Sequence, residues 1–527
     1  MIVKRPLYLA LVAALLMAVC SFVSGQDGTA AELAILTDLP GFGRAEQSVT
    51  YLKASNAGAY ERFGESVAMS ADGNTLAVGA IFEDSNATGI GGDQADISAP
   101  NAGAVYIFTR SGNTWSQQAY IKASNTGASD RFGFSVALSH DGATLAVGAM
   151  GEDSAATGID GDQDDNSMDN AGAAYVFTRR GDTWSQQAYI KASNTGRVEE
   201  GDQFGYDVVL NGNGDTLAVS AISEDSAATG IDGDQSDDSA AEIGAVYTYV
   251  RDGADWSQQA YLKPRRATAE ALIGGLLFGF SIGLDESGDI LAISGFNEDT
   301  NRGSIYVFGR AGSDWSEQAR LVASNPERGD ALGSAIAVSA DGNTIAAGAF
   351  DEDSALVGIV PGDQGRDDQS TDLAIGAAYV FARHGDEWSQ QAFIKPTNTQ
   401  VNQHFGWALA LSLDGDTLAV GAHFENGGSS GINGDQRDTS AQDAGAAYVY
   451  SRTGTTWMPR AYVKASKTSV RAEFGTSVAL NDDGTDLAAG APRESSGATG
   501  INGNQADDSA AESGAVYIYS TGSPVVP

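Results

Sequence analysis

The chain has 527 residues, with 69 acidic against 30 basic side chains and a formal net charge of −39 at pH 7. This excess of acid excludes binding to nucleic acid or to an anionic membrane through the overall field of the protein. The single cysteine, Cys20, excludes a disulfide scaffold.

The first segments in chain order predict export. Lys4 and Arg5 precede an uncharged apolar stretch that ends in small residues, the pattern of a secretory signal peptide. We expect a signal peptide at residues 1–25, a linker at residues 26–45, and a secreted or cell-surface protein. Lipidation of Cys20 and an uncleaved membrane anchor remain alternatives. No second apolar stretch is long enough to span a bilayer, so we expect no membrane insertion of the mature chain.

One unit of chain recurs seven times and dominates residues 46–521. Each unit opens on Phe-Gly, with Leu-Gly in one copy, and successive openings lie 54 to 74 residues apart. Such a period is typical of an array of one supersecondary unit. The opening residues are Phe63, Phe132, Phe204, Phe278, Leu332, Phe405 and Phe474.

Each unit contains four short runs rich in β-branched and aromatic residues, which predict strands. An Asp-Gly pair, Asp141-Gly142 in the second unit, separates the first two runs and is a strong hairpin signal. Four antiparallel strands in sequence order make one blade of a β-propeller. In the second unit the predicted strands cover residues 132–139, 144–149, 172–178 and 183–190.

The two ends of the array predict a closed ring. The last unit stops after its third run, at residues 514–520, and the missing fourth run precedes the first unit, at residues 46–55. An N-terminal strand that completes the last blade would remove the edges of an open array. The predicted fold is therefore all-β, a seven-bladed β-propeller of four-stranded antiparallel blades at residues 46–521, with a tail at residues 522–527.

The order Phe-Gly, strand, turn, strand, Gly-Ala resembles the FG-GAP repeat of the integrin α-subunit β-propeller and its bacterial relatives. The last unit contains the full pattern, Phe474-Gly475 followed by Gly490-Ala491-Pro492, and the resemblance covers about residues 46–520. It implies a propeller with an extracellular adhesion or binding role. Several blades of that family carry a calcium loop between the first two strands. Here that connection, residues 70–75 in the first unit, is too short to surround a cation, so we do not expect the family's metal site.

The acidic residues concentrate in the long connection between the second and third runs. Six of the seven units share a core ending in Gly-Asp-Gln or Gly-Asn-Gln, and a propeller would place these connections on one face. We therefore expect a ring of six acidic loops. Two of them have the alternating carboxylate spacing of calcium loops, so Ca²⁺ binding and plain solvation of duplicated loops are both open. The candidate ligands are Asp160, Asp162, Asp164, Asp232, Asp234 and Asp237.

The fourth unit interrupts the predicted ring. Its connection is short, residues 296–303, and the preceding inter-blade segment, residues 263–277, is basic and then apolar. This gap is a candidate docking position for a partner, and simple drift of one copy is the alternative. The candidate contacts are Arg265, Arg266, Glu298 and Asp299.

No catalytic constellation recurs in the sequence. The histidines, His140, His384, His404 and His423, lie in predicted turns and loops, and neither a nucleophile elbow nor a zinc spacing is present. We expect no enzymatic activity, no cofactor other than Ca²⁺, and a monomer. The predicted function is a secreted or cell-surface binding or adhesion propeller that presents an acidic loop face to a protein or glycan. A structural matrix protein without a defined ligand and a glycan-active enzyme are the alternatives.

Overall fold

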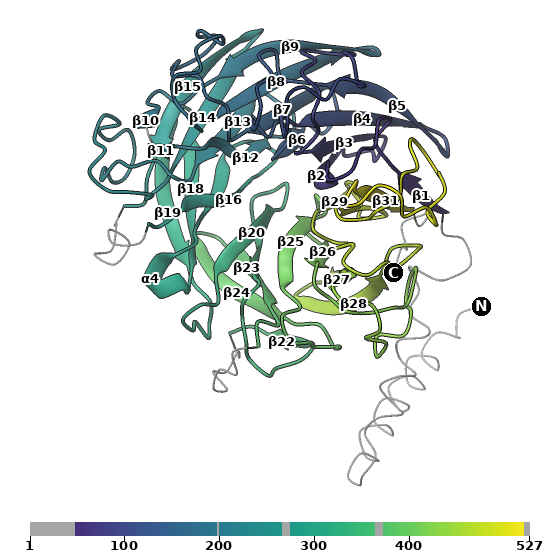
Figure 1. The fold of residues 1–527 in the computed structure, drawn as a ribbon. Coiled ribbons are helices and arrows are strands. Elements are labelled where there is room, and N and C mark those ends of the chain that lie inside the picture. Colours follow the sequence, from purple (N-terminus) through teal and green to yellow (C-terminus); the bar gives the residue numbers. More distant parts are fainter. Residues whose placement is uncertain (1–47, 198–199, 266–274, 364–372, 521–527) are drawn as a thin grey trace, which may run out of the picture.

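A computed structural model describes residues 48–197, 200–265, 275–363 and 373–520. The expected signal peptide (1–25), which includes Cys20, the linker (26–45) and the tail (522–527) lie outside these residues. Seven four-stranded antiparallel sheets surround a central axis (Figure 1), which confirms the seven-bladed propeller. One of the sheets carries a fifth, short strand.

In six blades the strands follow sequence order from the axis outward, and in the seventh the N-terminal strand takes the outermost place. The innermost strands are β2 (Phe63–Met69), β6 (Val136–Leu138), β12 (Phe204–Leu210), β16 (Phe278–Leu284), β20 (Leu332–Val338), β25 (Phe405–Leu411) and β29 (Val478–Leu480). The second strands are β3 (Thr75–Ala80), β7 (Thr144–Ala149), β13 (Thr216–Ala221), β17 (Ile290–Gly295), β21 (Thr344–Ala349), β26 (Thr417–Ala422) and β30 (Asp486–Ala491).

In six blades a short turn joins the two outer strands, whereas in the seventh these strands come from opposite ends of the array. The third strands are β4 (Ala104–Ser111), β8 (Ala173–Arg180), β14 (Ala245–Asp252), β18 (Ser304–Ala311), β23 (Ala377–His384), β27 (Ala446–Thr453) and β31 (Ala515–Ser520). The outermost strands are β5 (Thr114–Ile121), β9 (Thr183–Ile190), β15 (Asp255–Leu262), β19 (Asp314–Leu321), β24 (Glu387–Ile394), β28 (Thr456–Val463) and β1 (Ser48–Leu52). Shorter pieces are β10 (Gly196–Arg197), β11 (Glu200–Gly201), β22 (Ile359–Pro361) and the single turn α4 (Glu298–Asn301).

The N-terminal strand closes the ring, as the sequence predicts. β1 pairs with β31 in an antiparallel register that places Ser48 opposite Ser520 and Leu52 opposite Val516. Figure 1 shows β1 beside β31, so the two ends of the array share the seventh blade. No helix among the described residues is long and apolar enough to cross a membrane.

The Phe-Gly and Gly-Ala pairs are where neighbouring blades pack together. Phe405 is fully buried against Tyr448 and Tyr450 of its own blade, with ring planes nearly perpendicular. Gly406 has a φ of +96°, and a Cβ there would lie 2.3 Å from the Ala377 carbonyl oxygen of the preceding blade. Only glycine allows this conformation and this approach, so the motif is explained by blade packing.

In most blades a β-bulge follows the Phe-Gly or Leu-Gly pair. In β25 the register shifts between Phe405 and Leu409, and equivalent shifts occur in β2, β12, β16 and β20. A bulge bends a strand and turns a side chain out of the regular alternation. In the second blade the ladder starts only at Val136, so the strand predicted over residues 132–139 is shorter than expected.

Candidate functional site

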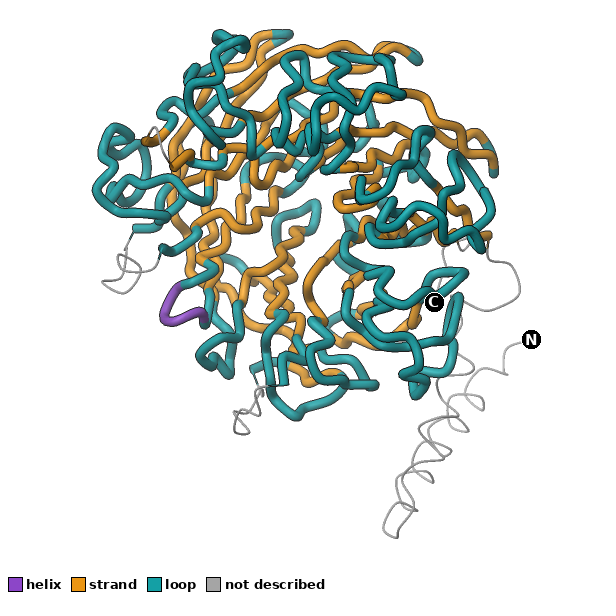
Figure 2. Tube along the Cα trace, viewed as in Figure 1, coloured by secondary structure: helices purple, strands orange, loops and turns teal. Residues whose placement is uncertain are grey.

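The connections between second and third strands lie beside the connections between blades, on what we call the loop face. Asn125, in the connection between the first two blades, donates to the Gln163 carbonyl oxygen at 3.1 Å and to Glu152 at 2.8 Å. The Ser124 hydroxyl also bonds to the Gln163 side chain, which explains the recurring glutamine as a tether between neighbouring blades. Figure 2 shows long loops gathered around the ring of strands.

The Gly-Ile-containing part of each long loop pairs with the outermost strand of its own blade. In the second blade, Asp160 N–H donates to the Tyr189 carbonyl at 2.7 Å and Lys191 N–H to the Gly158 carbonyl at 2.8 Å. Ile159 bridges Ile190 as a single extra β-pair. Equivalent bridges occur in the first, third, sixth and seventh blades, and β22 pairs with β24 in the fifth. The loops thus cover part of an exposed sheet edge, which otherwise invites pairing with other chains.

The structure places the candidate calcium ligands in these loops, where most hold the loop backbone. Asp160 Oδ1 accepts the Tyr189 N–H at 3.0 Å with a φ of +54°, and Asp232 does the same for Tyr261. Asp162 accepts the Asp164 N–H at 3.0 Å, which closes a local turn. Asp164 is itself exposed.

The remaining two candidates cap turns in the third blade. Asp234 accepts hydrogen bonds from Ser236, which lower the pKa of Asp234, and Asp237 accepts the Ser239 and Ala227 N–H groups. Within the described part of the chain, no group of three or more Asp, Glu, His or Cys side chains is arranged to hold a metal ion. Ca²⁺ binding therefore stays a prediction.

A buried Lys–Glu pair anchors each long loop in six of the blades. Lys122 Nζ lies 2.7 Å from Glu83, with the two side chains 0% and 1% exposed. Tyr120 and Asn56 donate to the second carboxylate oxygen at 2.8 Å and 3.0 Å. Burial lowers the pKa of Lys122, and Glu83 offsets part of that effect. The equivalent pairs are Lys53–Glu494, Lys191–Glu152, Lys263–Glu224, Lys395–Glu352 and Lys464–Glu425.

A second buried acid accompanies several of these pairs. Burial raises the pKa of Glu61, Asp130 and Asp330 to about 7 in each case. Burial and then Glu224 raise the pKa of Asp202 to about 8, and among the described residues neither Asp202 carboxylate oxygen has a hydrogen-bond partner. Many of the recurrent acidic side chains are therefore buried beneath the loop face.

The fourth blade uses a different ion pair. Its short connection forms α4, in which Asp299 and Thr300 have left-handed backbone angles. Glu298 is 3% exposed and accepts hydrogen bonds from Tyr306 at 2.9 Å and Arg320 at 3.0 Å. The expectation that Glu298 contacts a partner is wrong, because its carboxylate points into the blade and replaces the usual Lys–Glu pair.

The other candidate contacts of the fourth blade are more accessible. Asp299 lies 3.3 Å from the Arg320 guanidinium and is about half exposed. Arg265 is exposed, and its backbone N–H donates to Glu317 on β19 at 3.2 Å. Arg266 lies outside the described residues.

A continuous arc of aromatic and imidazole rings lies at the loop-face end of the innermost strands. Tyr206 contacts Phe134 of the preceding blade and Phe280 of the following blade, with ring centroids 5.0 Å and 5.4 Å apart. Contact between equivalent positions of neighbouring blades means that the rings run around the central axis. The bulges after Phe-Gly place Tyr206, Phe280 and Trp407 there. We call this set the aromatic arc: Phe134, Tyr206, Phe280, Phe296, Phe350, His404, Trp407, His423 and Phe424.

The arc continues through the connections of the fourth to sixth blades. Phe280 stacks on Phe296 at 4.2 Å with planes 15° apart, and Phe350 contacts Trp407 at 5.2 Å. Eight of the nine rings, all except His423, are partly exposed. Apolar rings grouped at a surface are typical of sites that bind other molecules.

Two histidines that the sequence places in unrelated turns meet in this arc. The rings of His404 and His423 lie 5.3 Å apart, and Nδ1 of each is buried without a hydrogen-bond partner. Burial lowers the pKa of His404 to about 4 and that of His423 to about 3, so both are neutral at pH 7. Sequence reasoning missed them because each occurs in one unit only.

The remaining part of the inner rim, at the seventh and first blades, is ionic. Arg493 lies 2.9 Å from Glu473 and 3.6 Å from Glu512, and Arg62 lies 3.4 Å from Glu512. Burial raises the pKa of Glu473 to about 7. The inner rim therefore has an aromatic side and an ionic side.

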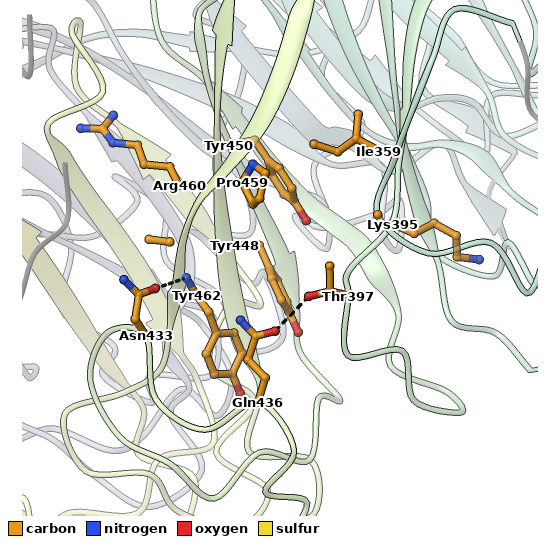
Figure 3. A pocket seen from close by; sticks show the side chains of 12 residues that line it. Ile359, Lys395, Thr397, Asn433, Gln436, Tyr448, Tyr450, Pro459, Arg460 and Tyr462 are labelled. Carbon is orange, nitrogen blue, oxygen red and sulfur yellow. Dashed lines mark hydrogen bonds between the residues drawn. The ribbon is translucent and has the colours of Figure 1, made fainter. Parts of the chain in front are cut away.

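A cavity of about 210 Å³ lies between the fifth and sixth blades (Figure 3). Tyr448, Tyr450 and Pro459 line it, and a hydrogen bond of 3.0 Å between Thr397 and Gln436 crosses one side. The first, second, third and fifth blades have glutamine at the Pro459 position, as in the bond from Gln117 to Ser55. Loss of that side chain explains the space, which is smaller than typical ligand pockets.

Four segments of the chain match the FG-GAP repeat family: residues 47–108, 115–177, 315–381 and 388–450. Each begins at or in the outermost strand of one blade and ends in the third strand of the next. No curated protein matches the chain.

Two solved structures are similar to the chain. The chain is similar to the β-propeller domain of Cps50 (Swd1) from Myceliophteria thermophila, with 11% identity and a TM-score of 0.48, over 90% of this chain and 99% of that one. It is also similar to a protein from Bacteroides uniformis named for 6-phosphogluconolactonase activity, with 9% identity and a TM-score of 0.43, over 73% of this chain and 84% of that one. Likeness at this level carries no inference about function.

Proposed function

Because this chain is an FG-GAP repeat β-propeller, we propose that it is a secreted or cell-surface, non-catalytic propeller that binds an extracellular protein or glycan at its loop face. The observation that carries the proposal is the aromatic arc. Partly exposed rings from the second to the sixth blade form one continuous surface, and the rest of the rim offers arginine and carboxylate groups. Aromatic side chains and arginine are the residues that most often dominate binding energy at interfaces.

The use of the carboxylates supports a binding role over a catalytic one. Glu83, Glu152, Glu224 and Glu425 each accept hydrogen bonds from a lysine, a tyrosine and an asparagine, and Asp160 and Asp232 hold the backbone of the outermost strand. Carboxylates with these partners stabilise the fold. The two neighbouring histidines have lowered pKa values, which makes them weak proton acceptors at neutral pH.

The binding proposal is tested by screening the secreted form, residues 26–527, against arrays of glycans and of extracellular proteins. Each ligand that binds is then measured again with Trp407→Ala and with Phe280→Ala. We expect each variant to weaken binding at least tenfold, because truncating a central aromatic contact costs about 2 kcal/mol or more. The control is Met458→Ala, which removes an exposed side chain on β28 away from the arc. Equal affinity of all variants would contradict the proposal.

The calcium prediction has a separate test. The same protein is melted in EDTA, in millimolar Ca²⁺ and in Mg²⁺ at matched ionic strength. A rise in Tm specific to Ca²⁺ would show that the acidic loops hold the ion, since a ligand stabilises the state that binds it. Equal melting in Ca²⁺ and Mg²⁺ would assign Asp160, Asp232 and their neighbours to loop structure and solvation alone.

A further inference from the structure

The outermost strand of the fourth blade differs from the other six in what lies beside it. In those six blades the long loop pairs with the end of the strand through the backbone groups of two alternate residues. In the second blade these are the Tyr189 carbonyl and the Lys191 N–H, and in the sixth the Tyr462 carbonyl and the Lys464 N–H. The loop therefore occupies the outward-facing hydrogen-bonding positions at the end of the strand.

The fourth blade has no such loop, because α4 leads directly from β17 into β18. The equivalent positions at the end of β19 are the Arg320 carbonyl and the Val322 N–H. In the described part of the chain, neither group has a backbone partner on the outer side. Val322 is 42% exposed, whereas the lysine that replaces it in the other blades is fully buried.

The residues at positions 320 and 322 are also consistent with a strand edge that no loop covers. The tyrosine and lysine that end the outermost strand elsewhere become Arg320 and Val322. Arg320 takes over the ion pair to Glu298, so no buried lysine is needed beneath a loop. The strand can therefore stay open without leaving a buried charge unpaired.

The segments around this edge carry exposed arginines alongside the acids Asp299 and Glu317. Four arginines there are exposed: Arg265, Arg302, Arg320 and Arg328. Arg265 bonds through its backbone to β19, and Arg302 follows α4, whose Asp299 pairs with Arg320. Arg328 lies six residues beyond Val322. An acidic segment is attracted here and repelled by the acidic loops of the other blades.

We propose that β19, extended to Val322, accepts an extended acidic strand of a partner protein, which adds to the fourth blade as a fifth strand. The backbone of the Arg320–Val322 edge supplies the hydrogen bonds, and Arg265, Arg302 and Arg328 select acidic side chains. In the other blades the protein's own loop occupies this place, whereas among the described residues no loop covers it in the fourth blade. The proposal does not depend on the aromatic arc, which lies at the innermost strands.

The first test uses a defined probe, a nine-residue synthetic peptide in which glutamate alternates with valine. Binding to the secreted form is measured by fluorescence anisotropy, against a peptide with lysine in place of glutamate. Hydrogen exchange is followed with and without the acidic peptide. We expect at least tenfold tighter binding of the acidic peptide and slower exchange at the Val322 amide on binding. In the free protein, this amide should exchange faster than that of Lys122 or Lys191.

Two variants keep the test independent of folding. Val322→Pro removes the N–H that a partner strand needs, and proline is tolerated where a strand edge faces solvent. Arg302→Glu reverses one charge, with Arg180→Glu at the exposed end of β8 as the matched control. We expect a tenfold or greater loss for Val322→Pro, a smaller loss for Arg302→Glu and no change for Arg180→Glu, all with unchanged Tm.

Three results would overturn the proposal. These are absence of binding at millimolar peptide, undiminished binding by Val322→Pro, and equal binding of the basic peptide. Concentration-dependent dimerisation that Val322→Pro abolishes would also overturn it, because the edge would then pair with a second copy of this chain.

Discussion

Removing the lysine of one buried Lys–Glu pair should destabilise the propeller far more than removing the lysine of an exposed pair. In Lys122→Met the alkyl stem is kept and the charge is lost, so Glu83 remains buried and deprived of its closest donor. The Nζ to carboxylate distance is 2.7 Å, and both side chains are at most 1% exposed. Breaking a buried pair by removing one partner typically costs about 3–5 kcal/mol.

The matched control is Lys467→Met. Lys467 lies 2.9 Å from Asp508, but the two side chains are 33% and 68% exposed, and an exposed pair is worth about 1 kcal/mol or less. For about 470 folded residues the unfolding entropy near the Tm is roughly 1 kcal/mol per degree. We therefore expect Tm to fall by about 3–5 °C in Lys122→Met and by about 1 °C or less in the control.

The assay is thermal unfolding by circular dichroism and calorimetry, with the double variant Lys122→Met/Glu83→Gln included. The double variant should recover part of the loss, because it no longer buries an unpaired carboxylate. Equal Tm values for Lys122→Met and Lys467→Met would refute the assignment of these pairs as the anchors of the long loops.

Three further predictions concern buried titratable groups and ring closure. The pKa of Asp202 is raised to about 8, above its value in the unfolded chain, so this carboxyl destabilises the folded protein increasingly as the pH rises from about 4 to 8. In parallel thermal melts, Asp202→Asn should raise the Tm clearly at pH 8.5 and less at pH 5. The pKa of His423 is lowered to about 3, so below about pH 6.5 the unfolded chain binds a proton that the folded protein does not, and stability decreases as the pH is lowered. The Tm of His423→Phe, compared with that of the parent protein, should therefore increase between pH 7 and pH 4. Deleting residues 26–53 should lower Tm more than deleting residues 26–45, because only the longer deletion removes β1 and opens the seventh blade.

The fold was predictable because the same constraints recur in most of the seven units. Asp-Gly turns, Phe-Gly and Gly-Ala pairs each mark one position in the blade, and their repetition separates signal from chance. The fourth run missing from the last unit and present before the first predicted the pairing of β1 with β31. The strand boundaries were less predictable: β6 is only three residues long, because the segment after Phe132 turns before the ladder begins.

The candidate site was predictable only in part. Acidic loops on one face follow from topology, but their chemistry depends on contacts between residues about 40 apart, such as Lys122 and Glu83. Reading Glu298 as a surface contact was wrong, because its exposure depends on Arg320 in another strand. Recurrence gave no signal for the two histidines of the aromatic arc, since His404 and His423 each occur in one unit. One clue was available: the residue two positions after Phe is aromatic in several units, as in Tyr206 and Trp407.

The most direct test of the loop-face account is hydrogen exchange of the propeller with and without a ligand identified on the arrays. We expect exchange to slow in the segments that carry the aromatic arc, including residues 278–284, 350–354 and 405–411. Turns on the opposite face, such as residues 70–75 and 139–144, should be unaffected. Slowing confined to those turns, with the arc unchanged, would contradict the account.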